Sequence, residues 1–231
     1  MKRESMLGWL PLLAMVTAPL AAQDLHFIRW RGGYGALGFG GGNFKLTCDS
    51  GCAGAKLKAS DFTLLLGHQF GRRTRGEVGF QYMSNRETSS NAFTATAGAT
   101  VYLASTLHVS AGASYMRASV EESGGTYTGG GTGFSAGLGY DLFLGRRTAL
   151  TPYVSYSMGS LANIKRAQGG WVTSQTSGRL KALHFGVAIS ILHGQWECTT
   201  TSGEVIRLSG RDRMRFRGCL DQVKQRLENG R

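Results

Sequence analysis

The sequence predicts an all-β protein, an eight-stranded antiparallel up-and-down transmembrane β-barrel. Alternating apolar and small or polar residues, a strict alternation of tight and longer connections, and a secretory signal all point to this fold. The clearest strand is Leu180–Leu192, where the odd positions are apolar from Leu183 to Ile191 and the even positions are small or polar. Successive side chains of a strand point to opposite faces, so one face of this segment suits lipid and the other a polar lumen.

The first 22 residues have the pattern of a secretory signal peptide. Lys2 and Arg3 supply the positive start, Leu7–Leu20 is apolar, and two alanines provide small residues for cleavage before Gln23. Two prolines interrupt this short apolar segment, which disfavours a permanent anchor. No later window offers about 20 continuous apolar residues, so we expect no membrane-spanning helix after the signal. The mean hydropathy of -0.14 agrees with a barrel, because lipid-facing residues alternate with polar ones.

Eight segments show strand-like alternation. They are Gly33–Leu46, Ser60–Phe70, Gly76–Asn85, Ala92–Leu103, Leu107–Val120, Gly133–Phe143, Ala149–Gly159 and Leu180–Leu192. In the first of them, Leu37 and Phe39 share a face and half of the other residues are glycine. The chain has 35 glycines and 3 prolines, although glycine weakens a strand. A narrow lumen with little room for side chains explains this usage.

The connections between these strands fall into two alternating classes. Tight connections are expected at Gly71–Arg75, Ala104–Thr106 and Leu144–Thr148, and longer or more polar ones at Thr47–Ala59, Arg86–Asn91, Glu121–Thr132 and Ser160–Arg179. Outer-membrane barrels have short periplasmic turns and longer outer loops. With an even strand number, both termini are then expected in the periplasm.

With these features, the region from about Arg31 to Trp196 resembles the small eight-stranded outer-membrane barrels, the group that includes the OmpA transmembrane domain, OmpX and the opacity proteins. The resemblance rests on the signal, the alternation, the strand number and the loop asymmetry. It implies the outer membrane of a Gram-negative-type cell, with lipopolysaccharide outside and phospholipid inside. It also implies a structural, envelope-integrity or surface-interaction role rather than a wide pore.

His108 and Ser110 form the most tempting catalytic motif, because lipid A deacylases of barrel form use a His-x-Ser pair. A serine nucleophile needs a base within hydrogen-bond reach. Both residues are expected on the inward face beside the Ala104–Thr106 turn, however, far from an outer-leaflet substrate. We therefore expect no catalytic residue and no enzymatic activity.

Other polar residues are also expected to face the lumen, namely Glu77, Gln81, His108, Asp141 and His184. They form either a proton or ion path or a hydrogen-bonded network that fills a narrow barrel. The second interpretation is favoured, because eight strands leave space for little more than side chains.

Four cysteines lie in two places, Cys48 and Cys52 in the first longer connection and Cys198 and Cys219 near the C-terminus. Four cysteines allow three pairings. The predicted topology puts the membrane between the two pairs, which leaves Cys48–Cys52 and Cys198–Cys219 in oxidising compartments. No histidine lies close to Cys48 or Cys52, which argues against zinc, and we expect no metal or cofactor.

Basic residues outnumber acidic ones by 26 to 14, and the sequence pI is about 10.0. Loop cations are expected at Lys56, Lys58, Lys165 and Arg166, where they either bind lipopolysaccharide phosphates or another anionic surface ligand, or are ordinary solvated charges. The tight turns are expected to present further cations to phospholipid head groups, namely Arg72, Arg73, Arg75, Arg146 and Arg147. A basic chain also attracts nucleic acid, but without a recognition motif no nucleic-acid partner is expected.

The expected organisation is therefore a signal at 1–22, a barrel at 23–196 and a basic periplasmic tail at 197–231. In the tail, we expect a short strand at Glu204–Leu208 and a helix whose apolar face carries Phe216, Leu220, Val223 and Leu227. Two other functions remain as alternatives. One is a membrane-embedded lipid-modifying enzyme, and the other is a secreted calyx whose apolar face points inward to a small ligand.

Overall fold

The structure is a computed structural model, and it describes residues 28–49, 52, 54, 56–70, 73–104, 106–122, 125–144, 147–168, 171–200, 204–208 and 213–229. The expected signal peptide, residues 1–22, lies outside the described residues. The chain divides into two compact units, residues 31–194 and a second unit that contains residues 195–231.

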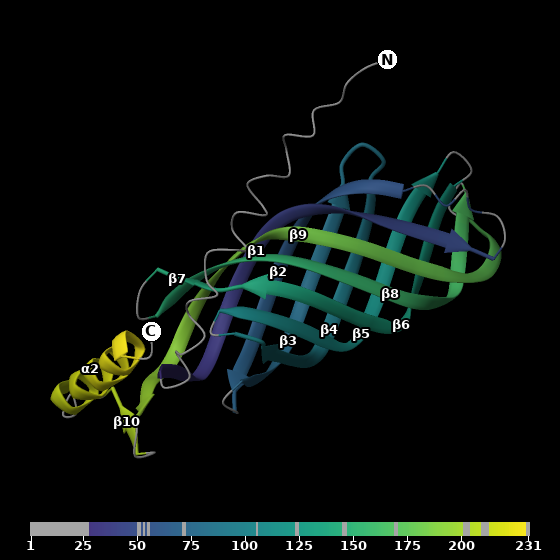
Figure 1. Ribbon diagram of the computed structural model, residues 1–231. Coiled ribbons are helices and arrows are strands. Elements are labelled where there is room, and N and C mark those ends of the chain that lie inside the picture. The colour runs from purple at the N-terminus through teal and green to yellow at the C-terminus, as the bar shows by residue number, and fades with distance from the viewer. Residues whose placement is uncertain are drawn as a thin grey trace. The chain divides into compact units, whose positions relative to one another are not determined.

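Eight long antiparallel strands close the first unit into a ring (Figure 1). They are β1 (Ile28–Cys48), β2 (Lys56–Gln69), β3 (Thr74–Asn85), β4 (Ser90–Tyr102), β5 (Leu107–Glu122), β6 (Gly125–Tyr140), β8 (Thr148–Gln168) and β9 (Trp171–Thr199). Each strand pairs with its neighbours in the sequence, and β9 pairs with both β8 and β1, so the sheet has no free edge within the ring. The two-residue strand β7 (Leu142–Phe143) follows β6 and pairs with β8. The predicted eight-stranded up-and-down barrel is confirmed.

Large apolar side chains cover the outer face of this ring. The exposed ones include Leu37, Phe39, Phe62, Leu66, Val78, Phe80, Val101, Leu138, Val154, Leu183, Phe185, Val187, Ile189 and Ile191. The residues between them point inward and are buried or small, as the alternation predicts. We call this exposed surface the apolar belt.

Two expected loops are strands instead. β5 continues to Glu122 and β6 begins at Gly125, while β8 continues to Gln168 and β9 begins at Trp171. The predictions of loops at 121–132 and 160–179 are therefore wrong. Most outward side chains become polar in these extensions, whereas Tyr127, Leu161 and Ile164 are buried and Val172 is exposed. The pattern that marks the belt therefore disappears although the strands continue. Between Leu161 and Ile164 the register shifts, and this irregularity keeps both side chains buried.

Inward glycines face one another across neighbouring strands, and they let the backbones approach. Gly98 pairs with Gly112 and Gly133 pairs with Gly159. A Cβ atom on Gly98 would lie 2.3 Å from the Ala111 carbonyl oxygen, and one on Gly133 would lie 2.1 Å from the Met158 carbonyl oxygen. The glycine content thus permits the tight curvature of a small barrel.

This geometry predicts a position-dependent cost of alanine. Gly133→Ala is expected to destabilise the barrel by about 1–3 kcal/mol, because backbone atoms rather than a flexible side chain must move. Gly41→Ala is the control, since its Cβ atom would meet the Ala59 oxygen at an ordinary 3.5 Å. Urea unfolding of both variants in lipid vesicles measures the difference. Equal stability of the two would show that the close approach is not required.

The second unit is a small module closed by a disulfide. β10 (Val205–Arg207) pairs with the end of β9, and helix α2 (Arg213–Asn229) follows. The disulfide Cys198–Cys219 joins the β9 end to α2, and both cysteines are buried with Ile206. The predicted strand and helix are confirmed.

Trp196 and Leu220 pack against this cysteine cluster, so Trp196 belongs to the module. Leu220 is the one residue of the expected apolar helix face whose side chain is described. No helix among the described residues combines the length and apolar character needed to span a bilayer.

Candidate functional site

The candidate site is the lumen of the barrel, which three groups of side chains fill. We call the end with the 70–73, 103–106 and 144–147 connections the turn end, and the opposite end the hairpin end. A charged network lies at the turn end, a cluster around Asp61 lies farther along, and an apolar group lies toward the hairpin end.

Arg75 is the centre of the turn-end network. Its Nε lies 3.4 Å from a Glu77 carboxylate oxygen, and its Nη1 lies 3.8 Å from Asp141. Nη1 also donates a 2.7 Å hydrogen bond to the hydroxyl of Tyr102. The guanidinium stacks over the ring of Tyr34, with 4.5 Å between its Cζ atom and the ring centroid. The side chain of Arg75 is 9% exposed, so two carboxylates and two aromatic rings take the place of the water molecules that would hydrate an exposed guanidinium.

The two carboxylates are bound in turn by hydroxyl groups. Tyr34 donates to Glu77 at 2.6 Å, and Tyr102 and Thr151 each donate to Asp141 at 2.6 Å. Such charge-assisted bonds are short and strong, and they hold every member of the network in one geometry.

The position of Arg75 differs from the one that the sequence predicts. It was expected in a tight turn facing phospholipid, but it lies in β3 and is 8% exposed. The alternation of β3 already contained the signal, because Arg75 shares the inward odd positions with Glu77 and Gln81. Arg73 remains exposed at the turn itself.

His108 and Ser110 both line the lumen, and the His108 ring lies in the turn-end network. Nε2 of His108 lies 3.2 Å from Arg75 Nη2, and Nδ1 lies 3.7 Å from Asp141. A guanidinium only donates, so Nε2 accepts and Nδ1 carries the proton toward Asp141. Both ring nitrogens are thus directed to the network rather than to the Ser110 hydroxyl.

The second polar group surrounds Asp61. Tyr153 and Gln81 donate to its Oδ2 atom at 2.8 and 3.2 Å. Nδ1 of His184 lies 3.6 Å from Oδ1 of Asp61, and the two side chains are 1% and 0% exposed. Glu77, Gln81, His108, Asp141 and His184 therefore all point inward as predicted, in two separate groups. Sequence reasoning did not select Asp61, Tyr34, Tyr102 or Tyr153.

Toward the hairpin end the lumen is apolar. The buried side chains include Phe44, Met83, Met116, Val120, Tyr127, Leu161, Ile164 and Leu180. Phe44, Met116, Ile164 and Leu180 are 0% exposed. This group blocks the lumen with packed hydrocarbon.

A cavity of about 110 Å³ lies in the lumen. Small polar side chains such as Thr63, Thr94, Ser110, Ser135 and Ser157 line it, together with Arg75 and Glu77. Apolar side chains, among them Leu65 and Ala188, also line this cavity, whose volume is large enough for several water molecules.

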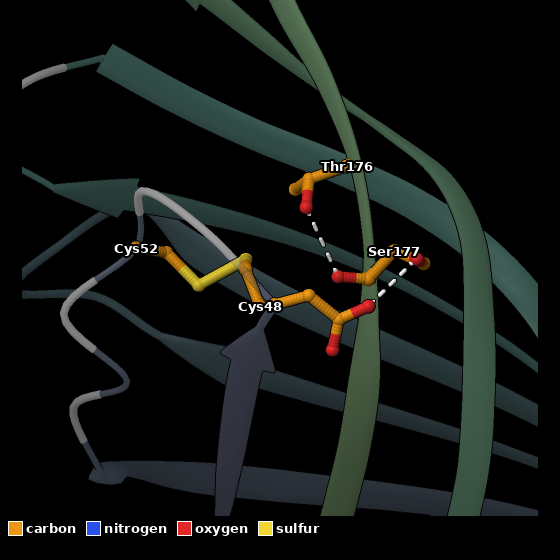
Figure 2. The surroundings of a disulfide bond; sticks show 5 residues. Cys48, Cys52, Thr176 and Ser177 are labelled. Carbon is orange, nitrogen blue, oxygen red and sulfur yellow. Dashed lines mark hydrogen bonds between the residues drawn. A yellow bond between two sulfur atoms is a disulfide. The ribbon is translucent and has the colours of Figure 1, made fainter.

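The first hairpin carries the other disulfide. Figure 2 shows the Cys48–Cys52 bond beside Ser177 of β9, whose hydroxyl donates a 2.7 Å hydrogen bond to Asp49. The main-chain NH of Asp49 also donates to the Ser177 carbonyl at 2.8 Å. Asp49, directly after β1, therefore lies against β9.

The four expected loop cations lie on strands. Lys56 and Lys58 are exposed on β2, and Lys165 and Arg166 lie on β8. Arg166 packs over the ring of Tyr127, with 5.7 Å between its Cζ atom and the ring centroid.

No protein-family model matches the sequence, and no curated protein matches it. Several solved structures have a fold similar to that of this chain. Neisserial surface protein A matches with a TM-score of 0.52 and 14% identity over 71% of this chain and 99% of that chain. The outer membrane protein AlkL gives 0.47 and 12% over 71% and 91%, and OprG from Pseudomonas aeruginosa gives 0.41 and 12% over 71% and 98%. With its closed ring of eight strands, the chain therefore has the fold of the small eight-stranded outer-membrane β-barrels.

Proposed function

We propose that this protein is a non-enzymatic outer-membrane β-barrel without a wide pore, with a structural, envelope-integrity or surface-interaction role. The apolar belt is the main observation that supports a location in the membrane. A water-soluble monomer rarely exposes an apolar patch larger than a few hundred Å², whereas this belt runs around the ring. A soluble calyx requires the opposite arrangement, with its apolar face inward and its outside polar.

The height of the belt is close to that of the apolar band on outer-membrane barrels. On β9 it runs from Leu183 to Ile191, about 27 Å along the strand at about 3.4 Å per residue. With a tilt of about 40°, this corresponds to about 21 Å of bilayer, close to the apolar band of about 25 Å on such barrels.

The orientation follows from the connections. We place the turn end in the periplasm and the hairpin end outside, as in other outer-membrane barrels. Both termini and the module at 195–231 are then periplasmic. The two alternatives lose support, because His108 and Ser110 lie inside the lumen and the belt faces outward.

Cell fractionation and gel mobility test this location. We expect the protein in the outer-membrane fraction, and a folded band that shifts on boiling, because a closed barrel resists unfolding by detergent. Recovery as a soluble periplasmic protein would contradict the proposal.

The filled lumen predicts low conductance. The apolar group and the Arg75 network occupy the lumen at different levels, so ions meet packed side chains. Planar-bilayer recordings of the purified protein should show no steady porin-sized current. A stable large current would mean that the barrel opens or assembles around a channel.

Both disulfides are proposed to form in the cell, since the periplasm and the cell surface are oxidising. Mass spectrometry of unreduced protein should find peptides joined through Cys48–Cys52 and through Cys198–Cys219. A peptide that joins Cys52 to Cys198 would contradict the topology.

A further inference from the structure

We propose that five outward cations on β9, β1 and β2 bind the phosphate groups of an outer-leaflet glycolipid. They are Lys45, Lys56, Lys58, Arg179 and Lys181, and we call them the basic row. This inference rests on the proposed membrane location and orientation, and it adds a specific lipid-binding surface.

The strand register brings these residues side by side. Lys45 of β1 pairs directly with Lys56 of β2. Two glycines of β9 give the register on the other side of β1. A Cβ atom on Gly178 would contact the Cα atom of Cys48, and a Cβ atom on Gly186 would contact the Cα atom of Gly40, so each glycine lies opposite that residue. The same antiparallel register places Lys181 opposite Lys45. Three ammonium groups therefore lie in one line across three adjacent strands.

Arg179 and Lys58 extend this line along the strands. Arg179 lies two residues from Lys181 on the same face of β9, and Lys58 lies two residues from Lys56 on the same face of β2. All five side chains are exposed. A single patch thus carries five positive charges.

This clustering is unfavourable without an anion. Like charges directly opposite one another destabilise a sheet. Within the described part of the chain, none of the five cations forms an ion pair with a carboxylate. The nearby carboxylate of Asp49, directly after β1, accepts a hydrogen bond from the Ser177 hydroxyl. The repulsion is relieved when a ligand brings negative charge to the patch.

The basic row borders the apolar belt, most directly on β9. On β9, Lys181 is followed on the same face by Leu183 and Phe185, which is 57% exposed. On β1, Asn43 and Gly41 separate Lys45 from Phe39, which packs edge-to-face against Phe62 of β2 farther into the belt, with 5.3 Å between the ring centroids. A ligand at this border meets charge on one side and hydrocarbon on the other.

This combination fits a phosphorylated, acylated glycolipid. Its phosphates lie at the level of the basic row, and its acyl chains lie against Leu183, Phe185 and Phe39. Ammonium groups on flexible stems bind phosphate as point charges and tolerate different phosphate positions. The hairpin-end location places this border in the outer leaflet, where lipopolysaccharide carries such phosphates.

The test compares two triple variants of the full-length folded protein in detergent. Lys45→Gln, Lys56→Gln and Lys181→Gln together remove the line of ammonium groups. Arg31→Gln, Arg73→Gln and Arg147→Gln remove the same charge from exposed residues at the turn end and serve as the matched control. Binding of fluorescent lipopolysaccharide is measured for each, in parallel with lipopolysaccharide whose lipid A phosphates have been removed enzymatically.

We expect the lysine variant to bind lipopolysaccharide at least tenfold more weakly than the parent, and the control variant to bind within twofold of it. Removing the phosphates should weaken binding to the parent and leave binding to the lysine variant almost unchanged. Rising salt should reduce the difference between parent and lysine variant, because the charges are exposed. Equal binding by both triple variants, or binding that does not depend on phosphate, would overturn the proposal.

Gel mobility and fractionation of the same variants separate the two proposals. If the lysine variant shows the heat-dependent shift of a folded barrel, its loss of binding is due to the missing cations of the basic row and not to misfolding. A parent that fractionates with the outer membrane but binds independently of the lysines refutes this inference alone. A parent that is soluble refutes the proposed function as well.

Discussion

Arg75→Met is expected to destabilise the folded barrel by about 3–5 kcal/mol, because it leaves Glu77 and Asp141 buried without their shared cation. Methionine keeps much of the side-chain volume, so the loss reports the charge rather than a cavity. Urea unfolding in lipid vesicles, followed by tryptophan fluorescence and gel mobility, measures the change.

A control and a rescue make this result specific. Arg73→Met changes an exposed arginine two residues away and should alter stability by less than about 0.5 kcal/mol. Adding Glu77→Gln and Asp141→Asn to Arg75→Met removes the uncompensated charges and should recover part of the loss. An Arg75→Met variant as stable as the parent would show that the network contributes no net stability.

Val187→Arg is expected to cost about 2–4 kcal/mol in a bilayer, because Val187 is 43% exposed at the centre of the belt on β9. The guanidinium would then lie near the bilayer midplane. The same unfolding measurement in vesicles tests this, and the cost should fall in detergent micelles, where water reaches the side chain more easily.

His193→Arg is the matched control, since His193 is exposed on the same face beyond Ile191. A cation near the interface costs about 0–1 kcal/mol on such barrels. The two substitutions add an arginine to the same strand at different depths. Equal costs for Val187→Arg and His193→Arg would contradict the membrane position of the belt.

The sequence by itself determined the strand number, the facing of the belt and the elements of the C-terminal module. The apolar face of Leu183–Ile191 repeats every two residues, which is the pattern of an extended chain with one face against an apolar environment. The positions of Glu77, His108 and Asp141 on the inward face followed from the same parity. Local alternation is enough for these features because each depends on one strand alone.

The length of the strands at the hairpin end, and the apolar interior there, could be determined only from the tertiary structure. Tyr127, Leu161 and Ile164 belong to one buried cluster inside the lumen, although the segments that carry them are expected to be loops. Their strands continue because cross-strand pairing and the shared interior stabilise residues that are far apart in sequence. Most outward residues there are polar, so the alternation that identifies a lipid-facing strand is reversed.

The contacts of the candidate sites also depended on the tertiary structure. The sequence places Arg75 in an expected turn, yet its position in β3 places it between Glu77 and Asp141, which directly follows β6. Lys45 becomes part of a charged row only because β2 and β9 bring Lys56 and Lys181 beside it. Sequence periodicity specifies which face a side chain occupies, whereas strand register and ring closure specify its neighbours, and those neighbours set the electrostatic energy of a charge.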